Sequence, residues 1–208
     1  SRMSEYAVGE IEDVALPELI DLFDKYDKPA TFAARGQLTE LPDSVLSLLL
    51  KSRVKHDIGV HGYYHRPFTS LSYNEAEVEI QMTLNGMHKF GLTPKSFIFP
   101  RSAIAHLQLL EKYDFECYRD RGTFSNDSMC IKKVGELWDV HPSLCIDQHT
   151  KPFFLKRLLN VSAKRNLPLH LWFHMRDFGE RPIDSEIREN MERVFVPFLD
   201  YADKKERK

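Results

Sequence analysis

The densest group of residues able to do chemistry lies in the stretch HDIGVHGYYH, residues 56–65, which holds three of the nine histidines in the chain. His61 and His65 are four residues apart, and in a turn that becomes helical this spacing lets two imidazole rings reach one ion. Gly62 between them permits a close backbone approach or an unusual dihedral angle. The alternative interpretation is structural, with His61 ending a strand and His65 packing in a loop.

Further charged and imidazole side chains follow other short apolar segments of the chain. Arg101 comes directly after KSFIFP, and His174 ends PLHLWFH. Others of this kind are Arg35, Arg119, Asp120, Arg121, Arg176 and Asp177. Because functional residues of parallel α/β folds gather at the carboxyl ends of the strands, we expect these groups to converge at one end of the sheet.

The apolar segments predict strands alternating with amphipathic helices. Strands are predicted at 29–35, 56–61, 95–100, 115–119 and 168–174, with a short one near 137–140. Helices are predicted at 16–26, 42–53, 72–90, 103–113, 151–165 and 184–203. The rest of 120–150 is predicted as loops. This alternation indicates parallel βαβ units. An open doubly wound sheet is the alternative architecture, although its Gly-rich dinucleotide loop is not found.

Four motifs together resemble the polysaccharide deacetylases, the carbohydrate esterases with NodB homology. HDIGVHGYYH resembles the family's second motif, H-E-I-G-x-H leading into H-x-x-x-H, and PATFAARGQL resembles its ATFFVxG strand. SFIFPRSAIAHLQLLEKYDFECYR and LHLWFH resemble a branch with F-P-R before a helix, a C-Y-R strand and a final L-H-L-W-F-H strand. The motifs follow the family order over residues 16–178. The resemblance implies an α/β fold, an irregular (β/α) barrel of about seven parallel strands, in a single domain of residues 1–208.

The resemblance also implies roles for individual residues. His61 and His65 match the two metal-binding histidines of the family. His174 matches the histidine that acts as general acid toward the leaving amine, and Asp120 and Asp177 are candidates to orient it. Arg101 falls in the third motif, whose arginine orients the catalytic aspartate, although here the arginine follows the proline instead of preceding it.

The family's first motif, a strand ending in an aspartate pair or D-x-E, has no clear counterpart. Counting back from the strand at 29–35 puts it at GEIED, residues 9–13. One interpretation takes Glu10 as the third metal ligand and Asp13 as the catalytic base, with Glu12 as a further substitute. Alternatively, the first strand lies before Ser1, so that this chain lacks or alters it. A further alternative is that the site has lost its catalytic base. Catalytic zinc normally has three protein ligands, so this motif is critical.

The function implied by the resemblance is a metal-dependent hydrolase that removes N-acetyl groups from an N-acetylated sugar or polysaccharide. Zn²⁺ is the expected metal, with Co²⁺, Ni²⁺ or Mn²⁺ as alternatives. A degenerate, non-catalytic barrel that binds a glycan is a second hypothesis, and Tyr63, Tyr64, Trp172 and Phe178 would then supply a stacking surface. A third is an amidase acting on a small non-sugar substrate.

Composition excludes several other classes of function. The formal net charge of −2 gives no electrostatic footprint for nucleic acid. No apolar run approaches the roughly 18 residues that membrane insertion requires. The three cysteines are widely spaced and predict neither a disulfide framework nor a CxxC metal site. SRMSEYAVGE at the start lacks the apolar core of a signal peptide, so we expect a cytoplasmic protein. The oligomeric state is left open.

Overall fold

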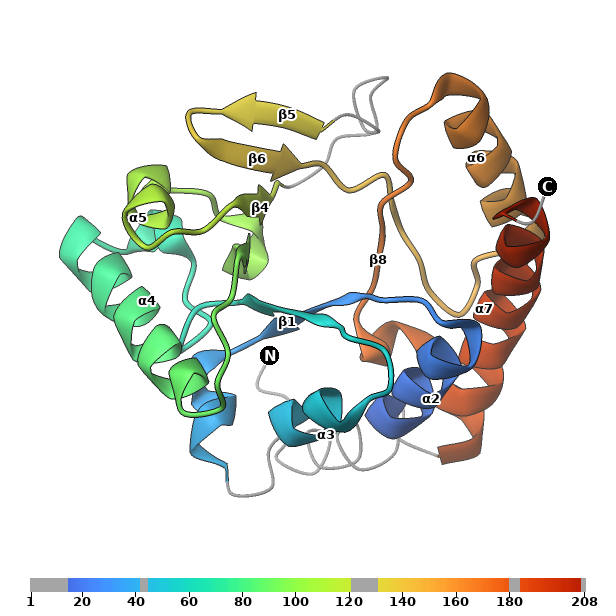
Figure 1. Ribbon diagram of the computed structural model, residues 1–208, viewed down its shortest axis with the longest axis horizontal. Coiled ribbons are helices and arrows are strands. Elements are labelled where there is room, and N and C mark those ends of the chain that lie inside the picture. The colour runs from blue at the N-terminus through green and yellow to red at the C-terminus, as the bar shows by residue number, and fades with distance from the viewer. Residues whose placement is uncertain (1–14, 42–44, 121–130, 180–183, 207–208) are drawn as a thin grey trace. The chain divides into compact units, whose positions relative to one another are not determined.

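The computed structural model describes residues 15–41, 45–120, 131–179 and 184–206 (Figure 1). The chain divides into two compact units. We call Pro29–Pro142 the central unit, and the unit made of Ser1–Lys28 and Ser143–Lys208 the terminal unit. The predictions for Glu10, Glu12 and Asp13 lie outside the described residues, and the expectation of a single domain stays a prediction.

A six-stranded sheet runs through the central unit in the order β1-β2-β3-β4-β6-β5. Its strands are β1 (Thr31–Ala34), β2 (Asp57–Val60), β3 (Ser96–Ile98), β4 (Cys117–Arg119), β5 (Ile131–Val134) and β6 (Leu137–Val140). Neighbouring strands are parallel except β5 and β6, which form an antiparallel hairpin beyond β4 (Figure 1). The carboxyl ends of the five parallel strands therefore lie along one side of the sheet, which we call the carboxyl edge.

The helices of the central unit are α3 (Val45–Lys51), α4 (Tyr73–His88) and α5 (Leu107–Lys112). Ser72 caps α4: its hydroxyl accepts from the backbone N–H of Glu75, and the Glu75 carboxylate accepts from that of Ser72. Helix α5 is shorter than the predicted 103–113. The residue before it, His106, has a φ of 58°. This left-handed conformation prevents the α-helix from extending further toward the N-terminus.

The core of the central unit is aromatic. Phe68, Phe97, Phe99, Phe115 and Tyr118 are all buried, and their ring centroids lie 4.7 to 6.0 Å apart in contacting pairs. The consecutive residues 97–99 are all buried, which is the pattern of a strand covered on both faces. This packing fixes the position of β3 and of the turn that follows it.

The terminal unit consists of α2 (Leu16–Tyr26), β7 (Leu144–Cys145), α6 (Pro152–Arg165), β8 (Leu171–Trp172) and α7 (Asp184–Glu206). Helix α7 packs against both α2 and α6 (Figure 1). Four phenylalanines form the centre of this unit, namely Phe23, Phe173, Phe178 and Phe195. Strands β7 and β8 are parallel and form a separate two-stranded sheet, so the described residues of both units contain parallel strands, as expected for an α/β fold.

The hairpin of β5 and β6 is the main departure from the predicted elements, because the sequence predicts loops and one short strand there. Every residue of β5 is exposed, so this strand carries no apolar periodicity. Val134 pairs with Leu137 across a two-residue turn in which Gly135 has a φ of 62°. The sequence does contain one signal for this hairpin, namely a glycine in a two-residue turn between two short strand segments.

Strand β8 is also shorter than the predicted 168–174. Within the part of the chain that the structure describes, none of the helices is both long enough and apolar enough to span a bilayer.

Candidate metal and catalytic site

His61 follows β2 directly and lies at the carboxyl edge of the sheet. Its Nδ1 is 2.6 Å from the carbonyl oxygen of Ile98, the last residue of the neighbouring strand β3. A carbonyl oxygen only accepts hydrogen bonds, so Nδ1 carries the proton and the lone pair of the neutral ring belongs to Nε2. A backbone carbonyl is a usual partner of a histidine that ligates a metal through its other nitrogen. The arrangement fits His61 as a ligand through Nε2.

His65 lies next to His61, with ring centroids 4.8 Å apart and ring planes at 67°. The turn between them is not helical, in contrast to the prediction, because Gly62 has a φ of 67° and His65 a φ of 59°. A non-glycine residue in this left-handed region is strained by about 1–2 kcal/mol. Such strain is concentrated at functional sites in proteins, where the surrounding structure holds it in place. The structure thus brings the two predicted metal-binding histidines together.

A buried carboxylate from α4 holds the backbone between the two histidines. Glu79 is 1% exposed, and its Oε2 accepts hydrogen bonds from the backbone N–H groups of Tyr63 at 2.6 Å and Tyr64 at 2.9 Å. Its Oε1 accepts from Nε of Arg66 at 2.7 Å. Sequence reasoning missed Glu79. The available signal was an acidic residue on the buried face of an amphipathic helix, directly before Ile80, where a carboxylate needs partners.

A close approach of the segment that follows β1 completes this support. The backbone N–H of Gly36 donates to the carbonyl oxygen of Gly62 at 2.9 Å. A Cβ atom at Gly36 would lie 2.4 Å from Cδ2 of Tyr63 and 2.6 Å from Oγ1 of Thr83. Only glycine leaves room for this contact.

The aromatic residues predicted as a stacking surface divide into two kinds. Tyr63 and Phe178 are buried and belong to the cores of their units, whereas Tyr64 is 50% exposed and Trp172 is half-buried. The Tyr63 hydroxyl donates to Glu40, and this hydrogen bond together with burial raises the pKa of Tyr63 to about 12. Two of the four residues are thus unable to stack on a glycan, because close packing leaves no face accessible.

His56, the third histidine of the stretch, has a structural role. Its Nδ1 accepts from the backbone N–H of Ala30 at 3.2 Å, and its Nε2 lies 3.0 Å from the Ser52 hydroxyl. It precedes β2 and therefore lies at the opposite end of the strand from His61. The three histidines thus divide into one structural residue and a pair.

Arg101 lies on a 3-10 turn, η4 (Pro100–Ser102), which begins two residues after the last residue of β3. Its side chain is exposed, and its φ of 55° is left-handed, like that of Ser102. Pro100 is buried, so Arg101 and not the residue before the proline reaches the surface at the carboxyl edge. Its predicted partner Asp13 lies outside the described residues, and the pairing stays a prediction.

In the terminal unit, Asp177 orients His174. Nδ1 of His174 is 3.0 Å from Oδ2 of Asp177, which also accepts from the backbone N–H of His174 at 2.7 Å. Asp177 lies on the 3-10 turn η5 (Met175–Phe178), so the pair is formed within one turn of chain. The His174 side chain is 51% exposed. This geometry places the Nδ1 proton toward the carboxylate, which leaves Nε2 to face solvent or a bound molecule.

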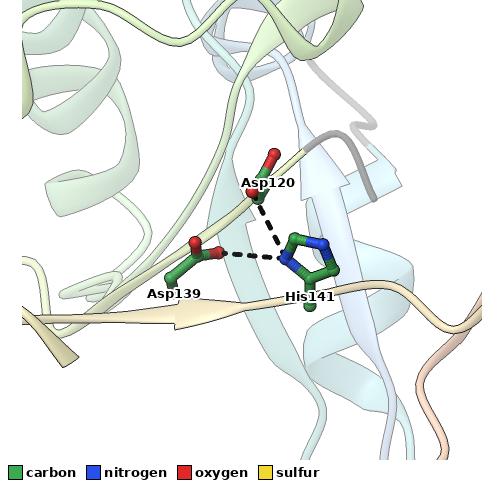
Figure 2. Close-up of side chains that lie close together, drawn as sticks. All are labelled: Asp120, Asp139 and His141. Carbon is green, nitrogen blue, oxygen red and sulfur yellow. Dashed lines mark ion pairs between the residues drawn. The ribbon is translucent and has the colours of Figure 1, made fainter. Parts of the chain in front are cut away.

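A second group of side chains, which the sequence did not predict, lies where β4 and β6 end (Figure 2). Nδ1 of His141 is 3.3 Å from Oδ2 of Asp120 and 3.9 Å from Oδ1 of Asp139. Asp120 is therefore the carboxylate nearer to His141, at ion-pair distance but without a hydrogen bond to Nδ1. Burial, followed by the charge of Asp120, raises the pKa of Asp139. Burial and the same two carboxylates raise the pKa of Tyr118 to about 12. No local signal predicts this group, because it depends on the pairing of β4 with β6.

Known proteins share both sequence and fold with this chain. The peptidoglycan deacetylase of Helicobacter pylori is 26% identical over 130 residues, which is 61% of this chain and 43% of the relative. The chain thus spans less than half the length of this curated relative.

Two solved structures are similar at low sequence identity. One, from Mycobacterium smegmatis and assigned to the polysaccharide deacetylases, has a TM-score of 0.70 at 14% identity, over 97% of this chain and 73% of that one. The other, BA3943 of Bacillus anthracis, is described as a family 4 carbohydrate esterase pseudoenzyme. It has a TM-score of 0.54 at 16% identity, over 93% of this chain and 62% of that one. At these identities the likeness shows the fold alone.

The family model described as "Polysaccharide deacetylase" matches residues 10–117. This segment is 108 of the 208 residues and contains β1, β2 and β3 with the histidine pair and Arg101. Since the match covers more than half of the chain, the chain belongs to the polysaccharide deacetylase family.

Proposed function

We propose that this protein hydrolyses the N-acetyl group of an N-acetylated sugar or polysaccharide, with a divalent metal held by His61 and His65. The observation that carries the proposal is the His61–His65 pair at the carboxyl edge, with the Ile98 carbonyl on Nδ1 of His61. Membership of the polysaccharide deacetylase family supports the reaction class. We propose Zn²⁺ as the metal, because two imidazoles are ligands typical of zinc, and a carboxylate from Glu10 as the third ligand.

The bound metal would supply Lewis acidity toward the acetamide carbonyl and a water whose pKa is lowered to about 7. The residues of the chain position the histidines and transfer the protons. Glu79 holds the turn that carries the two histidines, so their rings keep one geometry. Asp13 is proposed to accept a proton from the attacking water. His174, oriented by Asp177, is proposed to donate a proton from Nε2 to the departing sugar amine, so that acetate and the free amine are the products.

Acetate release from N-acetylglucosamine oligomers tests this proposal. We expect the metal-stripped chain to regain activity with Zn²⁺ or Co²⁺, and His61→Ala to remain inactive under the same conditions. His88→Ala is the matched control, because His88 is exposed at the end of α4. A folded, metal-loaded chain that releases no acetate from any N-acetylated glycan would contradict the proposal.

A non-catalytic glycan-binding protein is the second candidate. Within the described residues, His61 and His65 are not part of any group of three or more potential metal ligands, and a zinc site with two protein ligands is weak. A pseudoenzyme also has this fold. Metal analysis discriminates between the candidates. Bound metal below about 0.1 equivalent, with an intact fold and measurable binding of chitooligosaccharides, would favour this second candidate, since a weak site leaves the ion exchangeable.

A further inference from the structure

The register of β4 and β6 places four polar side chains together at the carboxyl edge. Tyr118 is paired with Asp139 in this parallel ladder. Two residues further along, Asp120 and His141 leave the two strands at the same level. Side chains two residues apart in a strand point to the same face of the sheet. Asp139 and His141 therefore share a face, and the same alternation brings Asp120 to the side of Tyr118.

Two atoms of this group are buried without a hydrogen-bond partner. The side chains of Asp139 and His141 are each 10% exposed, and neither Oδ1 of Asp139 nor Nδ1 of His141 has a hydrogen-bond partner within the described residues. Both atoms point into the centre of the group, where the Asp120 carboxylate also points (Figure 2). Buried polar atoms in folded proteins are nearly always paired, so this pair of atoms indicates a missing ligand.

We propose that Asp120, Asp139 and His141 form a second divalent metal site, separate from the His61–His65 pair. One ligand atom of each residue lies within 4.8 Å of those of the other two. Ligands at about 2.1 Å from one ion lie about 3–3.5 Å apart, so small side-chain rotations close the site. Two carboxylates balance the charge of a divalent ion.

The ligand types select among the divalent ions. A neutral imidazole with two carboxylates suits Zn²⁺, Co²⁺ or Mn²⁺, whereas Mg²⁺ and Ca²⁺ prefer oxygen ligands alone. Such an ion would join the end of β4 to the end of β6. It would thus attach the hairpin, whose outer strand β5 has only exposed residues, to the rest of the sheet. This site goes beyond the proposed function, because it assigns the ion a role in holding the sheet together.

Metal binding to the full chain, with the first histidine pair removed, tests the second site. In the double variant His61→Ala/His65→Ala, metal-stripped and dialysed against Zn²⁺, we expect about one bound equivalent per chain. Adding Asp139→Asn, which keeps the shape of the side chain, is expected to reduce bound zinc at least tenfold. Asp114→Asn is the matched control, since Asp114 is an exposed aspartate just before β4. We expect no competition from an equal concentration of Mg²⁺.

A double variant that is folded by circular dichroism and binds less than about 0.1 equivalent of Zn²⁺ would overturn the proposal. Unchanged zinc binding after Asp139→Asn would overturn it too. If that variant unfolds, Asp120→Asn replaces it, because the Asp120 side chain is 26% exposed. None of these measurements uses acetate release, so failure of the proposed activity leaves the result for this site unaffected.

Discussion

At the scale of single residues, the two histidines of the proposed catalytic metal site are held in different ways. His61 is fixed through its ring, by the hydrogen bond from Nδ1 to the Ile98 carbonyl. His65 is fixed through its backbone, in a left-handed conformation. Their spacing left a structural alternative open, and the resemblance to the polysaccharide deacetylases is what predicted both as a metal-binding pair. Neither the carbonyl partner nor the backbone conformation is visible in the sequence, because both depend on the neighbouring strand and on α4.

The left-handed conformation of His65 makes two substitutions differ in stability. His65→Ala and His65→Gly both remove the imidazole, but only glycine adopts this φ without a steric penalty. We expect the glycine variant to have a free energy of unfolding up to about 1 kcal/mol higher than the alanine variant, measured by urea denaturation. An alanine variant as stable as the glycine variant, or more stable, would show that the backbone at this position is not strained.

The pair of His174 and Asp177 predicts graded effects on turnover. Removal of a general acid in His174→Ala is expected to lower kcat by about 10²–10⁴-fold. Asp177→Asn keeps the acid but weakens its orientation, so we expect a smaller loss. Steady-state deacetylation kinetics of both variants check this order, with Glu186→Gln on the exposed face of α7 as control. Equal activity of His174→Ala and the wild type would remove His174 from the mechanism.

At the scale of elements, α4 is the main support of the site, because it provides the carboxylate of Glu79. That carboxylate binds two backbone N–H groups and one arginine in a buried position. The bounds of α4 were predicted within two residues from its amphipathic pattern, and Ser72 with Glu75 marks its start. The function of its buried acid was not predicted, since periodicity assigns a residue to a face and says nothing of its partners.

Glu79→Gln tests this support. An amide cannot accept from both backbone N–H groups and from Arg66 at once, and it leaves the guanidinium without its buried counter-charge. We expect the free energy of unfolding to fall by about 3 kcal/mol, measured by urea denaturation. Glu116→Gln is the control, because Glu116 forms an exposed ion pair with Lys95. This variant is expected to lower the free energy of unfolding by less than about 1 kcal/mol. A cost for Glu79→Gln as small as that of the control would contradict the proposed support.

At the scale of the whole molecule, the terminal unit is assembled from segments at the two ends of the sequence. Helix α2 contacts α7 through the Tyr26–Asp200 hydrogen bond and the Glu18–Arg188 ion pair, and Lys28, just after α2, pairs with Asp203. The bounds of α2 were predicted correctly from its apolar periodicity and the proline in its first turn. Its partner was not predicted, because an amphipathic pattern identifies a buried face without naming the element that covers it.

Tyr26 makes this helix pair sensitive to alkaline pH. Burial, and then the hydrogen bond to Asp200, raise the pKa of Tyr26 to about 12, compared with about 10 in an unfolded chain. The folded state thus keeps a proton that the unfolded state releases, so this stabilisation is complete below pH 10 and is lost as pH rises toward 12. We expect Tyr26→Phe to cost about 1 kcal/mol at pH 8.

The difference in the free energy of unfolding between wild type and Tyr26→Phe is expected to narrow between pH 10 and pH 12. Urea denaturation at several pH values measures this difference. Asp200→Asn keeps a hydrogen-bond acceptor but removes the charge, so it is the matched variant. A difference that stays constant over this range would show that Tyr26 does not retain its proton in the folded state.

The overall fold was more predictable than the candidate sites. Alternating apolar segments were enough for the parallel order of β1 to β4, since each of these strands carries buried residues. The exposed strand β5 was missed, and with it the group formed by Asp120 and His141, because that group depends on which strand pairs with β4. Side chains gathered by one local motif were thus found, and those gathered only by strand pairing were not.

The pairing of α2 with α7 has a consequence for synthesis on the ribosome. Tyr26 and Asp200 are 174 residues apart in the sequence, so at 5–20 residues per second roughly 10 to 35 s pass before both have been translated. During that interval the apolar face of α2 has no partner helix, and an eleven-residue helix is marginal on its own in water. The central unit lies wholly between the two helices in the sequence, so it can fold while the nascent chain still waits for α7.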